Sequence, residues 1–371
     1  MVPPMTGSLA VGGTCGGDPL MCRADLEVER FRGVGVELAR LGARAGDRLR
    51  VASRRGAVVL FHRGHEHSGR MAHLADELDL PDFDFFAWDA RGHGRSPGQR
   101  GHSPSFAHSV RDVQTFIEHI GTQHGVAEHD IHVVAQSVGA VLVSTWAHDY
   151  APKVRGLTLA SPAFKVKLYV PFARPGLALM HKLRGLFFVN SYVKAKFLTH
   201  DAARIASFEA DPLITRPIAV NILLDLYAAA ERVVQDANAI VVPTQLLISG
   251  ADWVVHHKPQ HEFFERLGSA VKEKIELPGF FHDTLGEKDR APAVAAVRDF
   301  ILRLFDHPPP PALSSYWPEG SIYLGSFSKV LTPGIRLGYV VVPRPLILKM
   351  EQAKQATDLH TAQLTQMVVY E

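Results

Sequence analysis

Short apolar runs alternate with longer stretches of helical period through most of this chain, and this alternation restricts the possible fold more than any other feature. The runs occupy residues 57–61, 83–88, 131–135, 156–160 and 244–248. Their short length and continuous apolar character are typical of strands that are buried on both faces, as in parallel sheets. The pattern therefore predicts an α/β fold, with a mostly parallel sheet covered by helices on both faces.

The stretch between the second and third runs predicts a helix, with Ser103 or Ser105 as its cap. Its apolar residues recur at helical spacing: Phe106, Val110, Val113, Ile117 and Ile120. The first 56 residues are weakly specified by comparison, because they are rich in Gly, Arg and Leu without clear strand alternation. Within them, we expect a helix over residues 26–41.

The composition excludes several classes of protein. Of the 371 residues, 46% are hydrophobic, and 40 Lys and Arg nearly balance 38 Asp and Glu. Nucleic-acid-binding proteins normally carry a larger excess of positive charge, so we expect no nucleic-acid partner. Cys15 and Cys22 are the only cysteines, which excludes a disulfide framework or a Cys-rich zinc site in the body of the chain.

The N-terminal sequence has no basic leader, and glycines interrupt its weak apolar stretch. We therefore expect no signal peptide and a cytoplasmic location. No apolar run approaches the roughly 18 residues that would indicate a membrane-spanning helix.

Two segments interrupt the alternation of strands and helices. Residues 163 to about 235 contain prolines and mixed helical pieces, as an inserted cap over the sheet would. Further on, four consecutive prolines, Pro308 to Pro311, favour a stiff linker over 307–317. We therefore divide the chain into a weakly specified segment 1–56, a main domain 57–306 and a C-terminal segment 318–371.

The strongest motif lies where the third strand run ends. There Ala135-Gln136-Ser137-Val138-Gly139 leads from a strand directly into a helical stretch, which is the context of a serine nucleophile on a tight turn. Small residues two positions either side of Ser137 allow the backbone to approach itself closely. The following helix would direct backbone N–H groups toward a developing oxyanion. An ordinary Ser in a strand-to-helix loop is the alternative interpretation.

An acid and a base follow in the order that a serine hydrolase of this architecture requires. The run 244–248 is followed by Asp252, at the carboxyl end of a late strand, and we assign it as the acid. A strand-like run at 273–277 is followed by His282, which we assign as the base. His256 and His257 are the nearest alternatives among the 20 histidines.

The loop after the first strand run supplies the remaining part of such a site. We assign the two oxyanion-hole donors to the backbone N–H groups of Val138 and Gly64. The competing interpretation is a metal site, because this loop carries His62, His65, Glu66 and His67. The loop lacks the His-Glu-x-x-His spacing of a zinc helix, so we expect no metal.

Two local motifs carry a resemblance to a known family: Glu-His-Ser-Gly-Arg at 66–70 and a loop with Gly-His-Gly-x-Ser at 89–98. With the order of the nucleophile, acid and base, they make residues 57–306 resemble the α/β-hydrolase superfamily. Within it, the chain is similar to the monoacylglycerol lipase and lysophospholipase group, also described as serine aminopeptidase S33-like hydrolases.

The sequence departs from that group at three places. Arg63 stands where the group usually has Gly, which would reshape the oxyanion loop or place a cation beside the acyl site. Ala135 replaces the first Gly of the nucleophile motif, a mild change because Ala is nearly as small. The stretch before residue 57 is a poor match to the paired strands that usually open this fold. We therefore expect a sheet that is frayed or shortened at that edge.

The resemblance implies a serine esterase or lipase that hydrolyses carboxylic esters of acyl chains, such as monoacylglycerols or lysophospholipid-like esters. A peptidase or a thioesterase with the same three residues is the alternative.

The cap is basic between residues 163 and 200, where seven Lys and Arg residues occur without any Asp or Glu, among many large apolar side chains. Such a cap could contact a lipid surface transiently, or it could pack on the sheet with its lysines in solvent.

The C-terminal segment carries an unrelated signature at 323–339, with Ser326, Lys329 and Arg336. It resembles the lysine segment of class I pyridoxal-phosphate-dependent aminotransferases. In that family the residue matching Lys329 forms the Schiff base, and those matching Ser326 and Arg336 hold the cofactor phosphate. We interpret residues 318–371 as a truncated aminotransferase-like fragment without the rest of such a site, and expect no cofactor. A pyridoxal-phosphate-binding or regulatory protein that uses Lys329 is a further alternative.

Overall fold

An eight-stranded sheet forms the centre of the first of two compact units, Met1–Asp306. The computed structural model describes residues 25–30, 37–42, 55–167, 173–191, 193–306, 323–326, 338–341 and 343–357. In sheet order the strands are β1 (Asp25–Arg30), β2 (Glu37–Gly42), β4 (Phe83–Asp89), β3 (Gly56–Phe61), β5 (Ile131–Gln136), β6 (Gly156–Ala160), β9 (Thr244–Ser249) and β10 (Lys272–Leu277).

The sheet is mostly parallel, as the sequence predicts. All neighbours from β4 to β10 run parallel, whereas β2 runs antiparallel to both β1 and β4. The five predicted apolar runs are β3, β4, β5, β6 and β9, and each is buried along its whole length. The parallel strands therefore all direct their carboxyl ends to one edge of the sheet.

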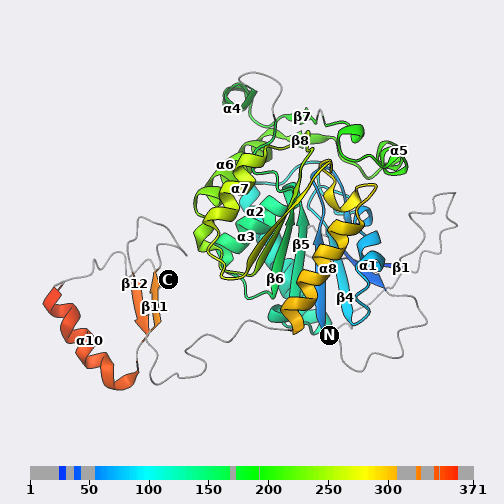
Figure 1. Ribbon diagram of the computed structural model, residues 1–371. Helices are drawn as coiled ribbons and strands as arrows, with labels where there is room; N and C mark the ends of the chain where they lie inside the picture. Colours follow the sequence, from blue (N-terminus) through cyan, green and yellow to red (C-terminus); the bar gives the residue numbers. More distant parts are fainter. Residues whose placement is uncertain are drawn as a thin grey trace, which may run out of the picture. The chain divides into compact units, whose positions relative to one another are not determined.

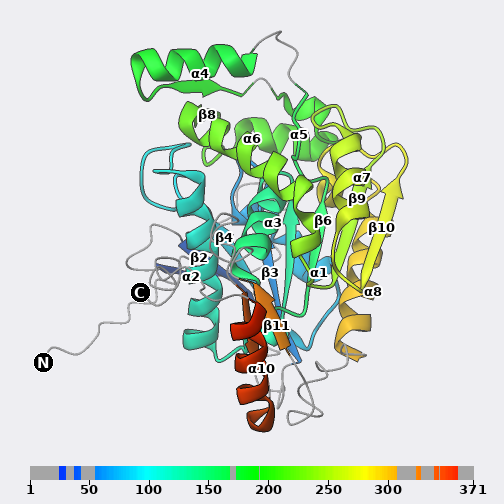
Figure 2. The same ribbon diagram turned by 90° about the vertical axis from the view of Figure 1, so that its left-hand side faces the viewer.

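Helices cover both faces of this sheet, as Figures 1 and 2 show. The helices of this unit are α1 (His73–Glu77), α2 (Phe106–His124), α3 (Val138–Tyr150), α4 (Ala173–Arg184), α5 (Ala202–Ala210), α6 (Val220–Gln235), α7 (His257–Arg266) and α8 (Ala291–Asp306). Alternate residues of β3 face two separate cores. Val59 and Phe61 pack with α2, α3, α6 and α7, whereas Val58 and Leu60 pack with α1 and α8.

Local sequence accounts for both ends of α2, the helix predicted from its apolar spacing. Of the two cap candidates, Ser105 is the N-cap, because its Oγ accepts a hydrogen bond from His108 N at 3.2 Å. The helix ends at Gly125, which has a φ of 69° and donates its N–H to Gly121 O at 3.1 Å.

The helix expected over residues 26–41 is wrong, because β1 and β2 occupy this part of the chain. The two strands pair antiparallel, and β2 also pairs with β4, so they extend the sheet at the edge where we expected it to be shortened. Leu26 and Val28 alternate with Glu27 and Glu29, which is the period of a strand. The free edge of β4 supplies hydrogen-bond partners that local spacing does not reveal.

The segment between β6 and β9 contains the elements that the sequence assigns to a cap. Besides α4, α5 and α6 it holds η3 (Ala195–Phe197) and an antiparallel pair of short strands, β7 (Phe188–Asn190) and β8 (Pro217–Ala219). In Figure 1, α4, β7, β8 and α5 lie beyond one end of the sheet. The last cap helix, α6, also contributes Leu226, Ala230 and Val233 to the core beside α3 and α7.

The second compact unit is His307–Glu371. Its described part contains an antiparallel pair of strands, β11 (Tyr323–Ser326) and β12 (Gly338–Val341), followed by α10 (Arg344–Thr357). Lys329 and Arg336 lie outside the described residues. Among the helices that the structure describes in either unit, none is both long enough and apolar enough to cross a membrane.

The start of α3 packs against the end of β3 so closely that Gly139 has no room for a side chain. A Cβ atom at this position would lie 2.4 Å from His62 O and 2.9 Å from Phe61 O. We expect Gly139→Ala to lower the free energy of unfolding by about 1–3 kcal/mol, because backbone atoms cannot move away as a flexible side chain can. Urea unfolding followed by circular dichroism measures this.

Gly121→Ala is the matched control, because Gly121 lies inside α2 and the nearest atom to an added Cβ would be Val126 O at 3.4 Å. This control is expected to leave stability unchanged or to raise it by up to about 1 kcal/mol, since Ala favours a helix over Gly. Equal unfolding midpoints for Gly139→Ala and the wild type would contradict the close packing of α3 on β3.

Candidate active site

The backbone turns sharply between β5 and α3, and Ser137 occupies the turn. Its φ of 57° lies in the left-handed region, which a non-glycine residue adopts only where the surrounding structure holds it. Two backbone hydrogen bonds do so: Ser137 N donates to Ala160 O at 2.9 Å, and Ala163 N donates to Ser137 O at 3.1 Å. The turn therefore fixes Ser137 at the edge where the parallel strands end.

The three residues predicted as nucleophile, base and acid meet at this edge, although 145 positions separate the first from the second. Ser137 Oγ lies 2.7 Å from Nε2 of His282, and Nδ1 of His282 lies 2.7 Å from Oδ2 of Asp252. All three are buried, with exposed fractions of 5%, 2% and 3% for Ser137, His282 and Asp252. The imidazole in contact with Ser137 thus belongs to His282 rather than to His256 or His257.

The carboxylate of Asp252 is held by the loop after β9. Its Oδ1 accepts hydrogen bonds from Val254 N at 2.7 Å and Val255 N at 3.0 Å, which leaves Oδ2 for His282. Burial alone would raise the pKa of Asp252, but the neighbouring His282 and the two backbone donors outweigh it, so the pKa lies below its ordinary value. The carboxylate therefore stays ionised and can fix Nδ1 of His282 as the protonated ring nitrogen.

The two residues predicted as oxyanion donors, Gly64 and Val138, are neighbours. A Cβ atom built on Gly64 would lie 3.0 Å from Cγ2 of Val138. Val138 is the first residue of α3, so its N–H has no partner within the helix. The positive end of the α3 dipole also lies here, which favours negative charge at this point.

The histidines of the loop after β3 turn toward separate partners. His62 Nδ1 lies 2.6 Å from Arg63 O, and its Nε2 accepts a hydrogen bond from Ala90 N at 3.1 Å. His65 Nδ1 lies 2.6 Å from Thr215 O. Among the described residues, no group of three His, Cys, Asp or Glu side chains is arranged to hold a metal ion.

Arg63, which replaces the usual Gly, takes part in ion pairs with two buried carboxylates. Its Nε and Nη2 donate to Glu66 at 2.9 and 2.5 Å, and Nη2 lies 3.6 Å from Oδ2 of Asp283. Burial would lower the pKa of the Arg63 guanidinium, but Asp283 and Glu66 raise it further than burial lowers it. The extra cation is therefore matched by carboxylates of the protein itself.

Three polar residues next to the site were missed by the sequence analysis: Gln136, Arg204 and Asp283. Gln136 precedes Ser137 and Asp283 follows His282, so their positions along the chain were a possible signal. Arg204 lies on α5, and its guanidinium contacts Asp283 across 79 positions. Nothing in the sequence near Arg204 indicates that contact.

The C-terminal unit has its own relative. Over 52 residues, which are 14% of this chain and 13% of the relative, the chain is 56% identical to the 2-aminoadipate transaminase of Thermus thermophilus. Besides the lysine and the residues that hold the phosphate, a pyridoxal-phosphate site requires a group that binds the pyridine nitrogen. The matched segment covers only 13% of the transaminase, so it corresponds to one part of such a site.

The main domain resembles lipases in sequence and structure. It is 65% identical over 248 residues to the uncharacterized protein YnbC of Escherichia coli, covering 67% of this chain and 42% of YnbC, so the chain spans about two fifths of that relative's length. It is 26% identical over 257 residues to the monoacylglycerol lipase of Mycolicibacterium smegmatis, covering 67% of this chain and 88% of that protein.

A solved structure shows the same fold. The monoacylglycerol lipase of Paleococcus ferrophilus superposes with a TM-score of 0.62 at 25% identity, over 67% of this chain and 95% of that one. The family model described as serine aminopeptidase S33, a hydrolase family, matches residues 52–289. This match covers more than half of the chain and includes strands β3 to β10 and all the residues assembled at their carboxyl ends, so the protein belongs to the serine aminopeptidase S33 family and has the α/β-hydrolase fold.

Proposed function

We propose that this protein is a serine esterase or lipase that hydrolyses carboxylic esters of acyl chains through an acyl-enzyme intermediate. The observation that carries the proposal is the continuous chain of contacts from Ser137 Oγ through His282 to Asp252, with both distances at 2.7 Å. A neutral imidazole in that arrangement can remove the proton of the serine hydroxyl, and the carboxylate then stabilises the imidazolium.

The proposed reaction has two halves. In the first, Ser137 Oγ bonds to the ester carbonyl carbon while its proton moves to Nε2 of His282. The carbonyl oxygen becomes an oxyanion, which accepts hydrogen bonds from the backbone N–H groups of Gly64 and Val138. The ester C–O bond then breaks, and His282 returns the proton to the departing alcohol.

In the second half, water replaces the alcohol. His282 takes a proton from the water molecule while the water oxygen bonds to the acyl carbon. Collapse of the second tetrahedral intermediate breaks the bond to Ser137 Oγ, which recovers its proton from His282. The products are a carboxylic acid and the free enzyme, so the reaction consumes one water molecule and requires no cofactor.

The similarity to monoacylglycerol lipases supports acylglycerol or lysophospholipid-like esters as the substrate class. The family description also names an aminopeptidase, which keeps an amide substrate as the second candidate, and a thioester as a third. All three substrates would use the same acyl-enzyme chemistry. Rates on acyl esters, aminoacyl anilides and acyl thioesters distinguish them.

Helix α4 supports contact between the cap and a lipid surface. None of its residues is buried, and Leu179 and Leu183 are 59% and 74% exposed. Lys182 and Arg184 are also exposed on this helix. An amphipathic helix of this kind can insert its leucines among acyl chains while its cations approach lipid phosphates. The cap would then touch the lipid transiently as substrate enters.

Replacement of any of the three catalytic residues tests the reaction. Ser137→Ala, His282→Gln and Asp252→Asn are each expected to lower kcat on a p-nitrophenyl ester by about 10⁴-fold, because each removes one member of a unit that acts together. Labelling by a fluorophosphonate, mapped to its peptide, is expected on Ser137 in the wild type. Circular dichroism verifies that each variant is folded.

His256→Gln serves as the matched control, because His256 is an exposed histidine next to the acid loop. It is expected to keep wild-type activity. Full activity of Ser137→Ala, or label on another residue, would overturn the nucleophile assignment. Loss of activity in His256→Gln but not in His282→Gln would overturn the assignment of the base.

The lipid contact has its own test. Leu179→Ser combined with Leu183→Ser is expected to weaken binding to vesicles of phosphatidylcholine and phosphatidylserine by at least about 10-fold, since burial of each leucine contributes about 1.5–3 kcal/mol. Hydrolysis of a soluble short-chain ester is expected to stay unchanged. Vesicle co-sedimentation measures the binding, and an assay with the soluble ester measures the hydrolysis.

Val241→Ser is the control for this test, because Val241 is 65% exposed outside the cap. It is expected to bind vesicles as the wild type does. Equal vesicle binding by the double leucine variant and the wild type would show that the exposed leucines of α4 do not contact lipid.

A further inference from the structure

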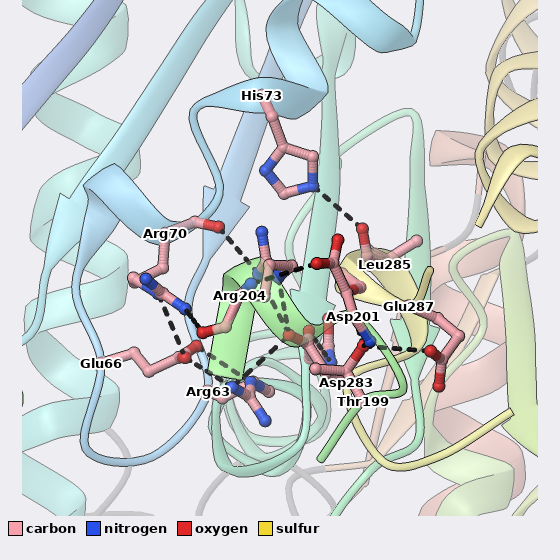
Figure 3. Close-up of polar contacts among 12 residues, drawn as sticks. Arg63, Glu66, Arg70, His73, Thr199, Asp201, Arg204, Asp283, Leu285 and Glu287 are labelled. Carbon is pink, nitrogen blue, oxygen red and sulfur yellow. Dashed lines mark hydrogen bonds and ion pairs between the residues drawn. The ribbon is translucent and has the colours of Figure 1, made fainter. Parts of the chain in front are cut away.

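Asp283 is a buried carboxylate that the proposed reaction does not use. It follows His282 directly and is 3% exposed. Its Oδ1 accepts a hydrogen bond from Nε2 of Gln136 at 3.1 Å. Its Oδ2 lies 3.1 and 3.0 Å from Nε and Nη2 of Arg204, and 3.6 Å from Nη2 of Arg63. Figure 3 shows this carboxylate with the two guanidinium groups directed at it.

Two partners of Asp283 stand next to other parts of the proposed catalytic site. Gln136 immediately precedes Ser137, and its Nε2 also lies 3.1 Å from the backbone carbonyl oxygen of His282. Arg63 immediately precedes Gly64, the proposed oxyanion donor. One carboxylate thus connects the nucleophile turn, the oxyanion loop and the loop of the base.

Arg204 belongs to α5, so its contact with Asp283 connects the cap to these three loops as well. Three further hydrogen bonds join the same helix to the oxyanion loop. Arg204 Nη2 donates to Arg70 O at 3.3 Å, and Arg70 donates to Arg204 O at 3.2 Å and to Ser207 Oγ at 2.7 Å. On the other side, Asp283 N donates to Leu198 O at 2.7 Å. Both loops are therefore bonded to one segment of the cap, as Figure 3 also shows for Arg70 and Arg204.

The charges in this cluster depend on one another. The cluster contains two carboxylates, Asp283 and Glu66. Oε1 of Glu66 lies 2.5 Å from Nη2 of Arg63 and 3.7 Å from Nε of Arg70. All of these side chains are buried, so each charge is stabilised by the opposite charges beside it rather than by water. Burial would raise the pKa of Asp283, but Arg204 and Arg63 hold it far below its ordinary value. Removing one charge leaves another buried without its partner.

We infer that Asp283, Arg63 and Arg204 form a positioning unit, through which the docking of α5 sets the placement of Gly64 and His282 around Ser137. None of the three touches the reacting atoms in the proposed mechanism. Arg63 and Asp283 transmit the position of the cap to the residues next to them in the chain. This inference rests on the proposed function, since it assigns these residues a role in that reaction.

Arg204→Gln tests the inference on the full chain, with a soluble short-chain ester as the substrate. We expect kcat per fluorophosphonate-titrated site to fall by about 10–100-fold with little change in KM, because small displacements of reacting groups slow the chemical step. Arg204→Lys retains the positive charge and is expected to recover part of the loss. A purely structural role would lower stability and leave kcat per titrated site unchanged.

Arg232→Gln is the matched control. Arg232 lies on another cap helix, α6, and its guanidinium forms an ion pair with Asp149 away from the catalytic loops. It is expected to keep wild-type kcat. Hydrogen exchange gives a readout that does not depend on turnover: in Arg204→Gln we expect faster exchange in residues 61–70 and 280–286, and in Arg232→Gln we expect none.

A double variant keeps the test valid if Arg204→Gln is unstable. Arg204→Gln combined with Asp283→Asn removes both charges, so its loss of stability and of kcat is expected to be smaller than the two single losses combined. Wild-type kcat and exchange in Arg204→Gln would overturn the inference, as would strict additivity in the double variant. Failure of the wild type to hydrolyse any ester would instead contradict the proposed function, and hydrogen exchange would still decide the positioning role.

Discussion

Parallel strands bring their carboxyl ends to a single edge, and the geometry of the whole site depends on that constraint. Ser137 follows β5, Asp252 follows β9 and His282 follows β10, so residues far apart in the chain begin their loops side by side. Gly64 follows β3, which is the neighbour of β5 on the other side. Each loop then needs only a few residues to carry its side chain or N–H group to the same point.

Short loops alone do not hold side chains accurately enough to form specific hydrogen bonds. Polar contacts between the loops around the site hold them more accurately. Asp89 illustrates this at the oxyanion loop: its two carboxylate oxygens accept hydrogen bonds from Ser68 N and Arg95 N, both at 2.7 Å. The loop with Gly-His-Gly-x-Ser is thereby attached to the loop after β3. A Cβ atom on Gly94 would lie 2.2 Å from Oδ2 of Asp89, which explains why this motif requires Gly there.

The same reasoning explains how Arg63 fits where the resembling group usually has Gly. A buried guanidinium without partners would be strongly destabilising, but Glu66 and Asp283 lie within reach of it. Glu66 belongs to the motif at 66–70, whereas Asp283 and Arg204 come from other parts of the chain. The cation at this position is therefore matched by one carboxylate in its own loop and one next to His282.

The sequence predicted the elements that depend on local pattern. Strands β3, β4, β5, β6 and β9 follow from apolar runs, and α2 follows from its spacing and from Ser105. The grouping of Ser137, Asp252 and His282 could be predicted because strand ends meet in a parallel sheet. The contact between Arg204 and Asp283 could not, since it depends on how α5 docks, and the strands β1 and β2 were missed because pairing with β4 decides their structure.

The two parts of the cap therefore differ in their relation to the site. Helix α5 is attached to the loop after β3 and to the loop of His282 by buried ion pairs and backbone contacts, so moving it away would leave Asp283 and Arg63 with fewer partners at a large cost in free energy. Helix α4 has no buried residue, and its ion pair between Arg174 and Glu231 is exposed, so its displacement would cost little. These contacts therefore allow α4 to move while α5 keeps the loop after β3 and His282 in place.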